Sequence, residues 1–320
     1  WVAWGLTLIA AGIELYSIWW NAFLYCMNRV QQSARIGFWT YLLRVGISCV
    51  LLASGLGLLS VPIGSIIGSL FGRLAAKRAV LDVLSRSAAE AGGFDMLSFL
   101  NLAWPNSWRL ALQSFGNYIR SNAMVQICVA YFGLGTTGDF GFSQQIMNLA
   151  YGMALVWTTV KWPRVMQLRS VNDVRSLREL LWPRLWLQIA TFVLLAGAAV
   201  LFGPLMLELL GTDKHLLPPR LLILLACTSL LDLHFVFWGT LLATENRIPT
   251  LWSTVVTSIL TVALAVAMVE ICSLGVLAIV LAPPITGLAF IYWYWPRVGA
   301  RSLDLSWCSF VLKRHGTTTR

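Results

Sequence analysis

Charged side chains are scarce in this chain of 320 residues, where Asp, Glu, Lys and Arg together make up only 11%. Soluble proteins carry about 25% charged residues, because most of their surface faces water. The chain also has 58% hydrophobic residues and a mean hydropathy of +0.75. This composition excludes a soluble enzyme and a disordered chain, and it predicts a polytopic membrane protein.

Motifs for metal binding, disulfide formation and catalysis are also missing. The sequence contains no Gly-x-Ser-x-Gly, Walker, His-Glu-x-x-His or paired-carboxylate motif. None of the cysteines stands in a Cys-x-x-Cys pair, and most lie in apolar runs, as is typical of buried thiols. These are Cys26, Cys49, Cys128, Cys227, Cys272 and Cys308. We therefore predict no metal, no cofactor and no enzymatic activity.

Long apolar runs, by contrast, recur along the whole chain. A spanning helix needs about 20 mostly apolar residues, since each adds about 1.5 Å across roughly 30 Å of hydrocarbon. No series of alternating strands suggests a barrel. The sequence predicts an all-α polytopic protein with about nine spans, at 1–27, 37–58, 61–76, 110–132, 141–160, 185–207, 219–243, 250–270 and 274–295. A short interfacial helix is also expected at 171–181.

The basic residues are distributed unevenly over the connections between these spans. Most of the 23 Lys and Arg residues follow the first, third, fifth, seventh and ninth spans, whereas the alternate connections contain only Lys214. Cytoplasmic loops carry such an excess, which predicts a cytoplasmic C-terminus and a cytoplasmic connection at 73–109. The net charge of +10 is therefore interpreted as a topology signal and an attraction to anionic membrane lipids, without nucleic-acid binding.

An internal repeat relates the two ends of the chain. Aligning the sequence with itself places Glu14 on Asp232 and Trp20 on Trp238. The same alignment places Asn28-Arg29 on Asn246-Arg247. Parallel repeats of this kind occur in secondary transporters. Because the chain starts at Trp1 inside an apolar run, we expect helices before it. The repeat predicts the last three helices of an incomplete bundle at 1–80, a cytoplasmic linker at 81–109, a six-helix bundle at 110–298 and a basic cytoplasmic tail at 299–320.

Several stretches resemble a known transporter family. The run LFGPLMLELLGTDKHLLPPRLLILLACTSLLD and the turn ATENRIPTL are similar to the C-terminal half of polysaccharide and O-antigen flippases. Those belong to the superfamily that also contains the multidrug and toxic-compound exporters. YFGLGTTGDFGFSQQIMNLAYG, followed by VKWPRVMQL, resembles the entry into the family's eighth helix. On this resemblance, the chain would correspond to helices four to twelve of a two-bundle, six-plus-six transporter.

The resemblance also implies a location and a passenger. Such flippases lie in the bacterial inner membrane and move undecaprenyl-diphosphate-linked oligosaccharide from the cytoplasmic to the periplasmic leaflet. They use a central cavity that opens alternately to each side, and they serve surface polysaccharide or O-antigen biosynthesis. The implied partners are the lipid-linked oligosaccharide, membrane lipids, and a polysaccharide polymerase with other assembly proteins.

Arg120 is the sharpest candidate for a substrate-binding residue, because ionisable groups inside hydrocarbon are costly unless they face protein or water. It lies near the middle of the span 110–132, and Gln113 and Asn117 precede it at helical spacing on one face. A guanidinium can donate two hydrogen bonds to a phosphate, as an anionic passenger would require. The alternative is a buried arginine that pairs with an acid and only fixes helix packing.

The next span repeats this spacing with Gln144, Asn148 and Tyr151. Their amides and phenol would hydrogen-bond sugar hydroxyls if they line a cavity. Polar side chains of this kind equally often join neighbouring helices in membranes, so both interpretations stay open.

Three further charged residues and one histidine within predicted spans are candidates for a role in transport. Arg44 is close enough to the cytoplasmic edge to act as a snorkelling anchor, which competes with a role in the cavity. Glu14 and Asp232 occupy equivalent repeat positions, where they either bind a coupling proton or Na⁺ or pair with the arginines. His234 is expected to pack near Trp238.

Four functional hypotheses follow. The favoured one is a flippase for lipid-linked oligosaccharide that works by alternating access. A cation-coupled multidrug exporter of the same architecture would need excess acid in its cavity. A membrane glycosyltransferase or acyltransferase would need acids or histidines at the membrane boundary, often with a sizeable outer loop. A structural scaffold would not need a buried Arg120.

Overall fold

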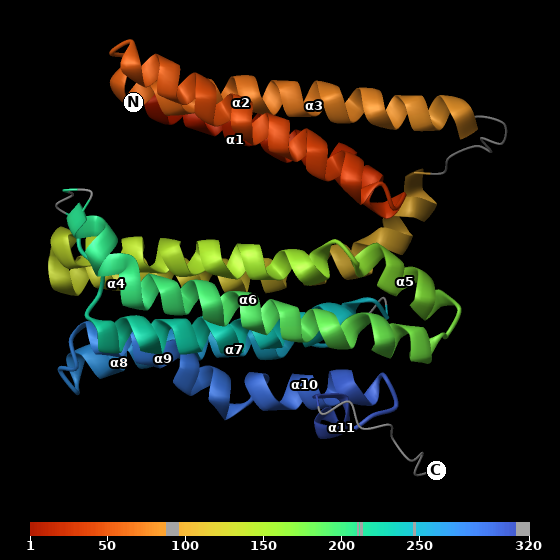
Figure 1. Cartoon of the computed structure of the whole chain (residues 1–320). Coiled ribbons are helices and arrows are strands. Elements are labelled where there is room, and N and C mark those ends of the chain that lie inside the picture. The colour runs from red at the N-terminus through yellow and green to blue at the C-terminus, as the bar shows by residue number, and fades with distance from the viewer. Residues whose placement is uncertain (88–95, 210, 212–213, 246–247, 312–320) are drawn as a thin grey trace. The chain divides into compact units, whose positions relative to one another are not determined.

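The computed structural model describes residues 1–87, 96–209, 211, 214–245 and 248–311, and every regular element in these ranges is a helix (Figure 1). This confirms the predicted all-α class. The chain divides into two compact units, Trp1–Asp95 and Met96–Arg320, which are described separately.

The first unit is a three-helix arrangement in which α3 packs against both α1 and α2. Its elements are α1 (Val2–Cys26), α2 (Val30–Ala53), the short 3₁₀ turn η1 (Gly57–Leu59) and α3 (Ser60–Ser87). Gly55 and Gly57 have φ angles of 86° and 53°, which side chains other than glycine rarely adopt. They end the second predicted span earlier than expected, and α2 also starts earlier, at Val30.

Glycines on α3 allow α2 to approach closely. Gly64, Gly68 and Gly72 recur every fourth residue, so they form one narrow stripe along the helix. A Cβ at Gly68 would lie 2.9 Å from Arg44 Cβ and 3.1 Å from the carbonyl oxygen of Thr40. The backbone of α2 therefore occupies the space that larger side chains on α3 would need.

Replacing Gly68 with alanine is expected to destabilise the first unit, because the added methyl group overlaps α2. Overpacking of this kind costs typically about 1–3 kcal/mol. Gly12→Ala in α1 is the matched control, since no heavy atom lies within 4 Å of a Cβ there. Thermal unfolding of the purified protein should show a lower midpoint for Gly68→Ala and an unchanged or higher one for Gly12→Ala. Equal midpoints would contradict close packing of α2 on α3.

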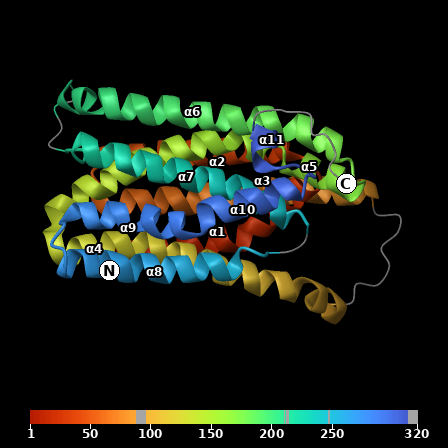
Figure 2. The same cartoon turned by 90° about the horizontal axis from the view of Figure 1, so that it is seen from below.

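The described residues of the second unit form the other eight helices. They are α4 (Met96–Thr159), α5 (Trp162–Ser170), α6 (Val174–Leu209), α7 (Pro219–Ala243), α8 (Leu251–Glu270), α9 (Val276–Ala289), α10 (Ile291–Arg301) and α11 (Trp307–Val311). Figure 2 shows α6, α7, α9 with α10, and α8 running across the unit in that order, and successive members of this series pack together. α4 packs against α6 and α8 at the two ends of the series, so the helices surround a common interior.

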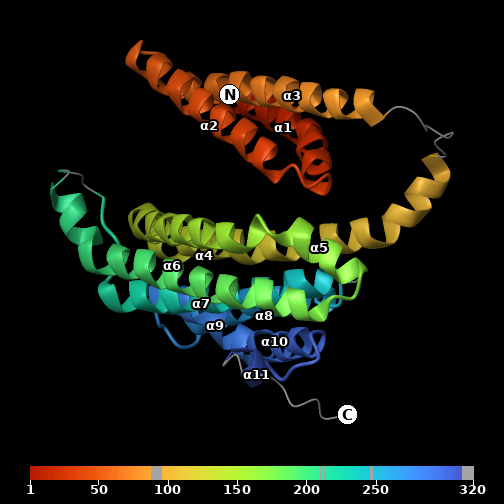
Figure 3. The same cartoon turned by 45° about the vertical axis from the view of Figure 1, so that its right-hand side comes forward.

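The long helix α4 is two arms joined at Gly133, where φ is 78° and ψ is 178°. The chain turns back at this point (Figures 1 and 3). The arms contain the predicted spans 110–132 and 141–160. The expected non-helical connection at 133–140 is wrong, because the second arm begins directly after Gly133 and Thr137 donates a hydrogen bond to the Gly133 carbonyl (2.7 Å).

Several other predicted boundaries need correction. The third span does not end at residue 76, since α3 continues to Ser87, and α4 begins at Met96. Helix therefore fills most of the predicted linker 81–109, while residues 88–95 lie outside the described residues. The ninth span, 274–295, is divided at Phe290 (φ −149°, ψ −57°) into α9 and α10, with a bend of 40°.

The separate interfacial helix predicted at 171–181 is wrong. The short helix is α5, which ends at Ser170, and most of 171–181 forms the beginning of α6. Asn172 has a positive φ of 53°, and the Asp173 carboxylate accepts a hydrogen bond from the Ser176 amide (3.0 Å). Asp173 therefore caps the N-terminus of α6.

The segment predicted as a basic tail at 299–320 is folded as far as it is described. Leu303 and Phe310 are buried in a cluster with Leu181 and Trp238. Trp182 also donates to the Val311 carbonyl (3.1 Å). Residues 312–320 lie outside the described residues, as does the Asn246-Arg247 turn of the predicted repeat.

Arg169 of α5 joins the helix ends beside this segment. Its guanidinium forms an ion pair with Glu245 (3.0 Å) just after α7. It also donates to the carbonyl oxygen of Ser302 (3.0 Å) and to that of Leu241 (3.5 Å). A single side chain thereby connects α5 with the ends of α7 and α10.

Six helices in the described part of the chain are long and apolar enough to cross a membrane, or seven if α9 and α10 form one bent span. α4 is not among them, although it contains two of the nine predicted spans. Many large apolar side chains are exposed. The prediction of buried thiols is correct for Cys128 and wrong for the other five cysteines, which are exposed. The apolar runs that contain most of these cysteines turn part of their surface outward, as in a protein surrounded by lipid.

Candidate substrate-binding site

α8 buries most of its hydroxyl groups inside the second unit, together with Leu251, Ala265 and Met268, and exposes large apolar side chains on its other face. The outer face exposes Trp252, Val256 and Ile259. The inner face is buried and contains Thr250, Thr254, Thr257, Ser258 and Thr261. A helix in lipid is expected to have this polarity, with polar groups directed toward protein. The hydroxyl face forms one wall of the polar interior.

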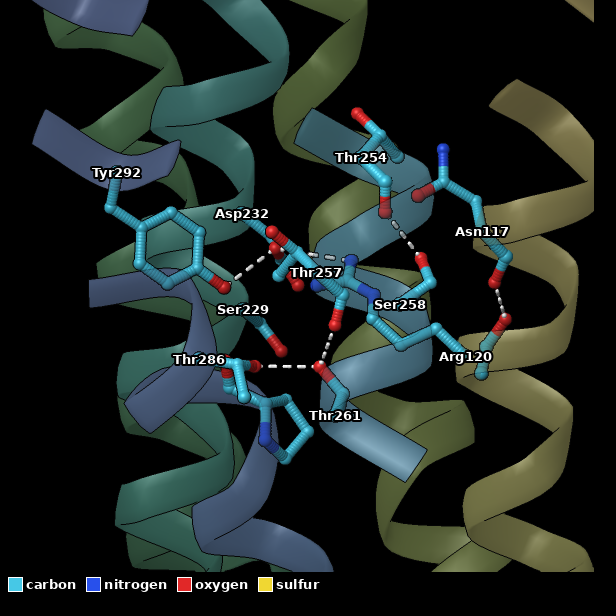
Figure 4. A network of polar contacts seen from close by, with 12 residues as sticks. Asn117, Arg120, Ser229, Asp232, Thr254, Thr257, Ser258, Thr261, Thr286 and Tyr292 are labelled. Carbon is cyan, nitrogen blue, oxygen red and sulfur yellow. Dashed lines mark hydrogen bonds and ion pairs between the residues drawn. The ribbon is translucent and has the colours of Figure 1, made fainter. Parts of the chain in front are cut away.

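An ion pair lies beside this wall. Arg120 of the first α4 arm and Asp232 of α7 are joined by a contact of 3.3 Å between Nη2 and Oδ1. The Tyr292 hydroxyl of α10 donates a hydrogen bond to the same carboxylate oxygen (2.8 Å). Figure 4 shows the three side chains directed toward one another, with Ser229 nearby. Only 18% of the Arg120 side chain and 23% of the Asp232 side chain are exposed.

The break between α9 and α10 positions the phenol of this cluster. The backbone turns at Phe290, and the Tyr292 ring then packs onto Gly287 of the preceding helix. A Cβ at Gly287 would lie 2.1 Å from Tyr292 Cε2, so any other residue there would displace the ring. Sequence reasoning missed Tyr292, because its role depends on this local break in the helix.

Hydroxyl groups continue the polar interior away from the ion pair. Thr261 of α8 and Thr286 of α9 share a hydrogen bond of 2.6 Å (Figure 4). The Thr254 hydroxyl is buried and has no hydrogen-bond partner among the described residues. The sequence contains a signal for this face, because Thr250, Thr254, Thr257 and Thr261 follow helical spacing.

The structure brings together only some of the three polar residues predicted on one face of the first α4 arm, Gln113, Asn117 and Arg120. Gln113 donates to the Thr250 hydroxyl (3.1 Å) and so connects α4 with α8. Arg120 points to Asp232, as described above. Asn117 is exposed, so it does not share the buried environment of the ion pair.

The three polar residues predicted on one face of the second arm, Gln144, Asn148 and Tyr151, also differ in their surroundings. Tyr151 packs against the buried core and lies close enough to interact electrostatically with Asp232 and Arg120. Gln144 is half-buried, whereas Asn148 is exposed. The second arm therefore contributes Tyr151 to the surroundings of the ion pair and does not bring Asn148 there.

The first unit contains a second ion pair, in which Arg44 of α2 contacts Glu14 of α1 (3.5 Å). Arg44 also donates from Nε to the Ser65 hydroxyl of α3 (2.8 Å), so it is more than an anchor at the membrane edge. Both acids of the predicted repeat thus pair with an arginine. The arginine comes from α2 in the first unit and from α4 in the second.

His234 packs near Trp238, as predicted. Its Nε2 accepts hydrogen bonds from the indole N–H of Trp238 (3.1 Å) and from that of Trp307 (3.2 Å). Because an indole nitrogen only donates, Nε2 carries no proton in this arrangement. The imidazole is therefore neutral and connects α7 with α11.

Among the described residues, no group of three or more His, Cys, Asp or Glu side chains is placed to hold a metal ion. No family model matches the chain, and no curated protein or solved structure matches it either. The resemblance to flippases therefore rests on the sequence stretches alone.

Proposed function

We propose that this chain belongs to a transporter that moves a lipid-linked oligosaccharide diphosphate across the bacterial inner membrane. The observation that carries the proposal is the ion pair of Arg120 and Asp232, with Tyr292, inside a helical unit whose outer surface is apolar. The cost of holding these charges in a membrane is expected to be offset by function, as ionisable groups in spans usually mark substrate or ion pathways.

The chemistry of the pair suits an anionic passenger. A phosphate can accept two parallel hydrogen bonds from a guanidinium and so compete with Asp232 for Arg120. The displaced carboxylate keeps its hydrogen bond from Tyr292 and then needs another cation or a proton. Binding of the passenger would thereby change the contact between α4 and α7, which is the kind of event that alternating access requires. The hydroxyl face of α8 provides partners for sugar hydroxyls.

The helix arrangement supports a two-bundle transporter built from parallel repeats. α7 and α8 pack with α9 and α10 in the second unit as α1 and α2 pack with α3 in the first. Counting the two arms of α4 as spans, we propose nine spans of a six-plus-six plan, with the C-terminus in the cytoplasm. The interior of the second unit pairs one acid with one arginine, so it offers a drug cation no excess negative charge at this centre.

An Arg120→Ala variant of the full-length protein tests this proposal. We expect loss of surface polysaccharide and accumulation of lipid-linked oligosaccharide in the cytoplasmic leaflet, because the passenger loses its cationic partner. Arg175→Ala is the matched control, since Arg175 is exposed and its ion-pair partner among the described residues is Glu179 of its own helix. Both proteins should be inserted in the membrane, although Arg120→Ala is expected to unfold at a lower temperature because Asp232 loses its partner. Normal export by Arg120→Ala would refute a substrate role, and its absence from the membrane would favour a packing role.

A further inference from the structure

A surface groove lies between the end of the second α4 arm and the beginning of α6. It has a volume of about 420 Å³, within the range of about 300–1,000 Å³ that is usual for small-molecule sites. Its apolar walls include Val156, Val160 and Leu187, which are exposed. The groove is separate from the interior, because the buried Thr158 hydroxyl donates to buried Gln188 (2.9 Å) and joins the two helices beneath it.

Two basic residues, Lys161 and Arg184, line this apolar groove. Among the described residues, no acid forms an ion pair with either of them, in contrast to Arg44, Arg120, Arg169 and Arg175. Arg184 donates one hydrogen bond to the Leu180 carbonyl (2.6 Å), which holds its side chain against α6. The groove therefore combines two uncompensated positive charges with an apolar surface.

The charges lie at the end of a helical arm, where a membrane boundary is expected. α4 ends at Thr159, two residues before Lys161. Trp157 also lines the groove, and its indole donates to the Thr191 hydroxyl of α6 (2.9 Å), which fixes the ring across the two helices. Tryptophan is enriched at membrane interfaces, and this end is the predicted cytoplasmic one, where anionic lipids attract Lys and Arg.

We propose that this groove binds an anionic membrane phospholipid, with its phosphate between Lys161 and Arg184 and an acyl chain against Val160 and Leu187. The complementarity carries the assignment: a phospholipid has a negative phosphate directly beside an apolar chain, and the groove has cations directly beside apolar walls. A bound lipid would bridge the second arm of α4 and α6 from outside. The inference does not depend on what the interior transports.

Lipid binding is measured by native mass spectrometry of the purified full chain in detergent, titrated with dioleoyl phosphatidylglycerol or with dioleoyl phosphatidylcholine. We expect the wild type to retain phosphatidylglycerol preferentially. Removing one charge, in Lys161→Gln or Arg184→Gln, should weaken this binding about fivefold, and the double variant about thirtyfold. Leu187→Trp fills the groove without changing its charge and should also weaken binding.

The control is Arg164→Gln with Arg175→Gln, which removes the same charge from nearby residues outside the groove. It should bind phosphatidylglycerol like the wild type, as should the charge-conserving pair Lys161→Arg and Arg184→Lys. The proposal is overturned if the double variant still binds normally, if the control loses as much affinity, or if phosphatidylcholine binds equally well. Displacement of phosphatidylglycerol by millimolar inorganic phosphate alone would also overturn it, since the acyl chain would then contribute nothing.

Discussion

Asp232→Leu is expected to abolish export and to destabilise the second unit strongly. The substitution leaves Arg120 inside the protein without a counter-charge and removes the acceptor of the Tyr292 hydroxyl. Breaking a buried ion pair by deleting one partner typically costs about 3–5 kcal/mol, because the remaining charge is uncompensated. The midpoint of thermal unfolding, followed by tryptophan fluorescence of the purified protein, measures this loss.

Glu179→Leu provides the matched control for that measurement. It also removes an acid paired with an arginine, but this pair spans one turn of α6 at the surface and both side chains are mostly exposed. Exposed pairs contribute only about 0–1 kcal/mol. If both variants unfolded at the same temperature, Arg120 and Asp232 would not form a buried pair in the working protein.

Arg169→Ala is the second variant with a large expected effect. It deletes the ion pair with Glu245 and the hydrogen bonds to the carbonyls of Ser302 and Leu241. We expect a loss of about 1.5–3 kcal/mol, because the buried end of Arg169 loses charge-assisted hydrogen bonds, whereas Glu245 is exposed and its ion pair adds little. Arg169→Lys should rescue little, since an ammonium group cannot reproduce the planar fork of donors.

Limited proteolysis is the second readout for Arg169. Cleavage within the segment from Ser302 to Val311 should become faster, because that segment loses its attachment to α5. Arg164→Ala in the same short helix serves as the control, as the hydrogen bond that Arg164 forms in the described part of the chain stays within α5, to Gln167. Equal cleavage rates in the two variants would show that Arg169 does not anchor the segment.

The sequence predicts a helix accurately where polar residues clearly separate its apolar run from the next one. α7 and α8 agree closely with the spans expected at 219–243 and 250–270, because both are long apolar runs with polar connections. The composition of the Gly-rich stretch after Gly133 predicts a connection between spans, yet the stretch is helical, since only Gly133 itself has a non-helical backbone. Glycine marks a break only where the backbone needs it, and composition does not reveal which glycine that is.

The sequence predicts which charged residues belong to the candidate site, but it does not predict which side chains they contact. Arg120 and Asp232 stand out as charges inside apolar runs. They are 112 residues apart in the sequence, so only the packed structure shows that they form a pair. Tyr292 reaches Asp232 only because the chain breaks at Phe290. The same limit explains Asn117 and Asn148, which share helical spacing with inward residues and are nevertheless exposed.

The two acids of the predicted repeat pair with arginines from helices that do not correspond to each other in that repeat. Glu14 and Asp232 each pair with an arginine, although Arg44 lies on α2 and Arg120 on α4. Pairing removes much of the cost of placing these charges within apolar helices. It also makes each pair a contact that a bound anion can open, whereas a hydrophobic contact at the same place would not respond to an anion.

The most direct test of a substrate role for Arg120 is export by the double variant Arg120→Met with Asp232→Leu. Apolar side chains of similar volume often replace a buried ion pair without loss of stability. The double variant should therefore unfold near the wild-type temperature and still fail to move lipid-linked oligosaccharide. That result would assign the pair to transport. Wild-type export by a stable double variant would contradict it, and the pair would then serve helix packing alone.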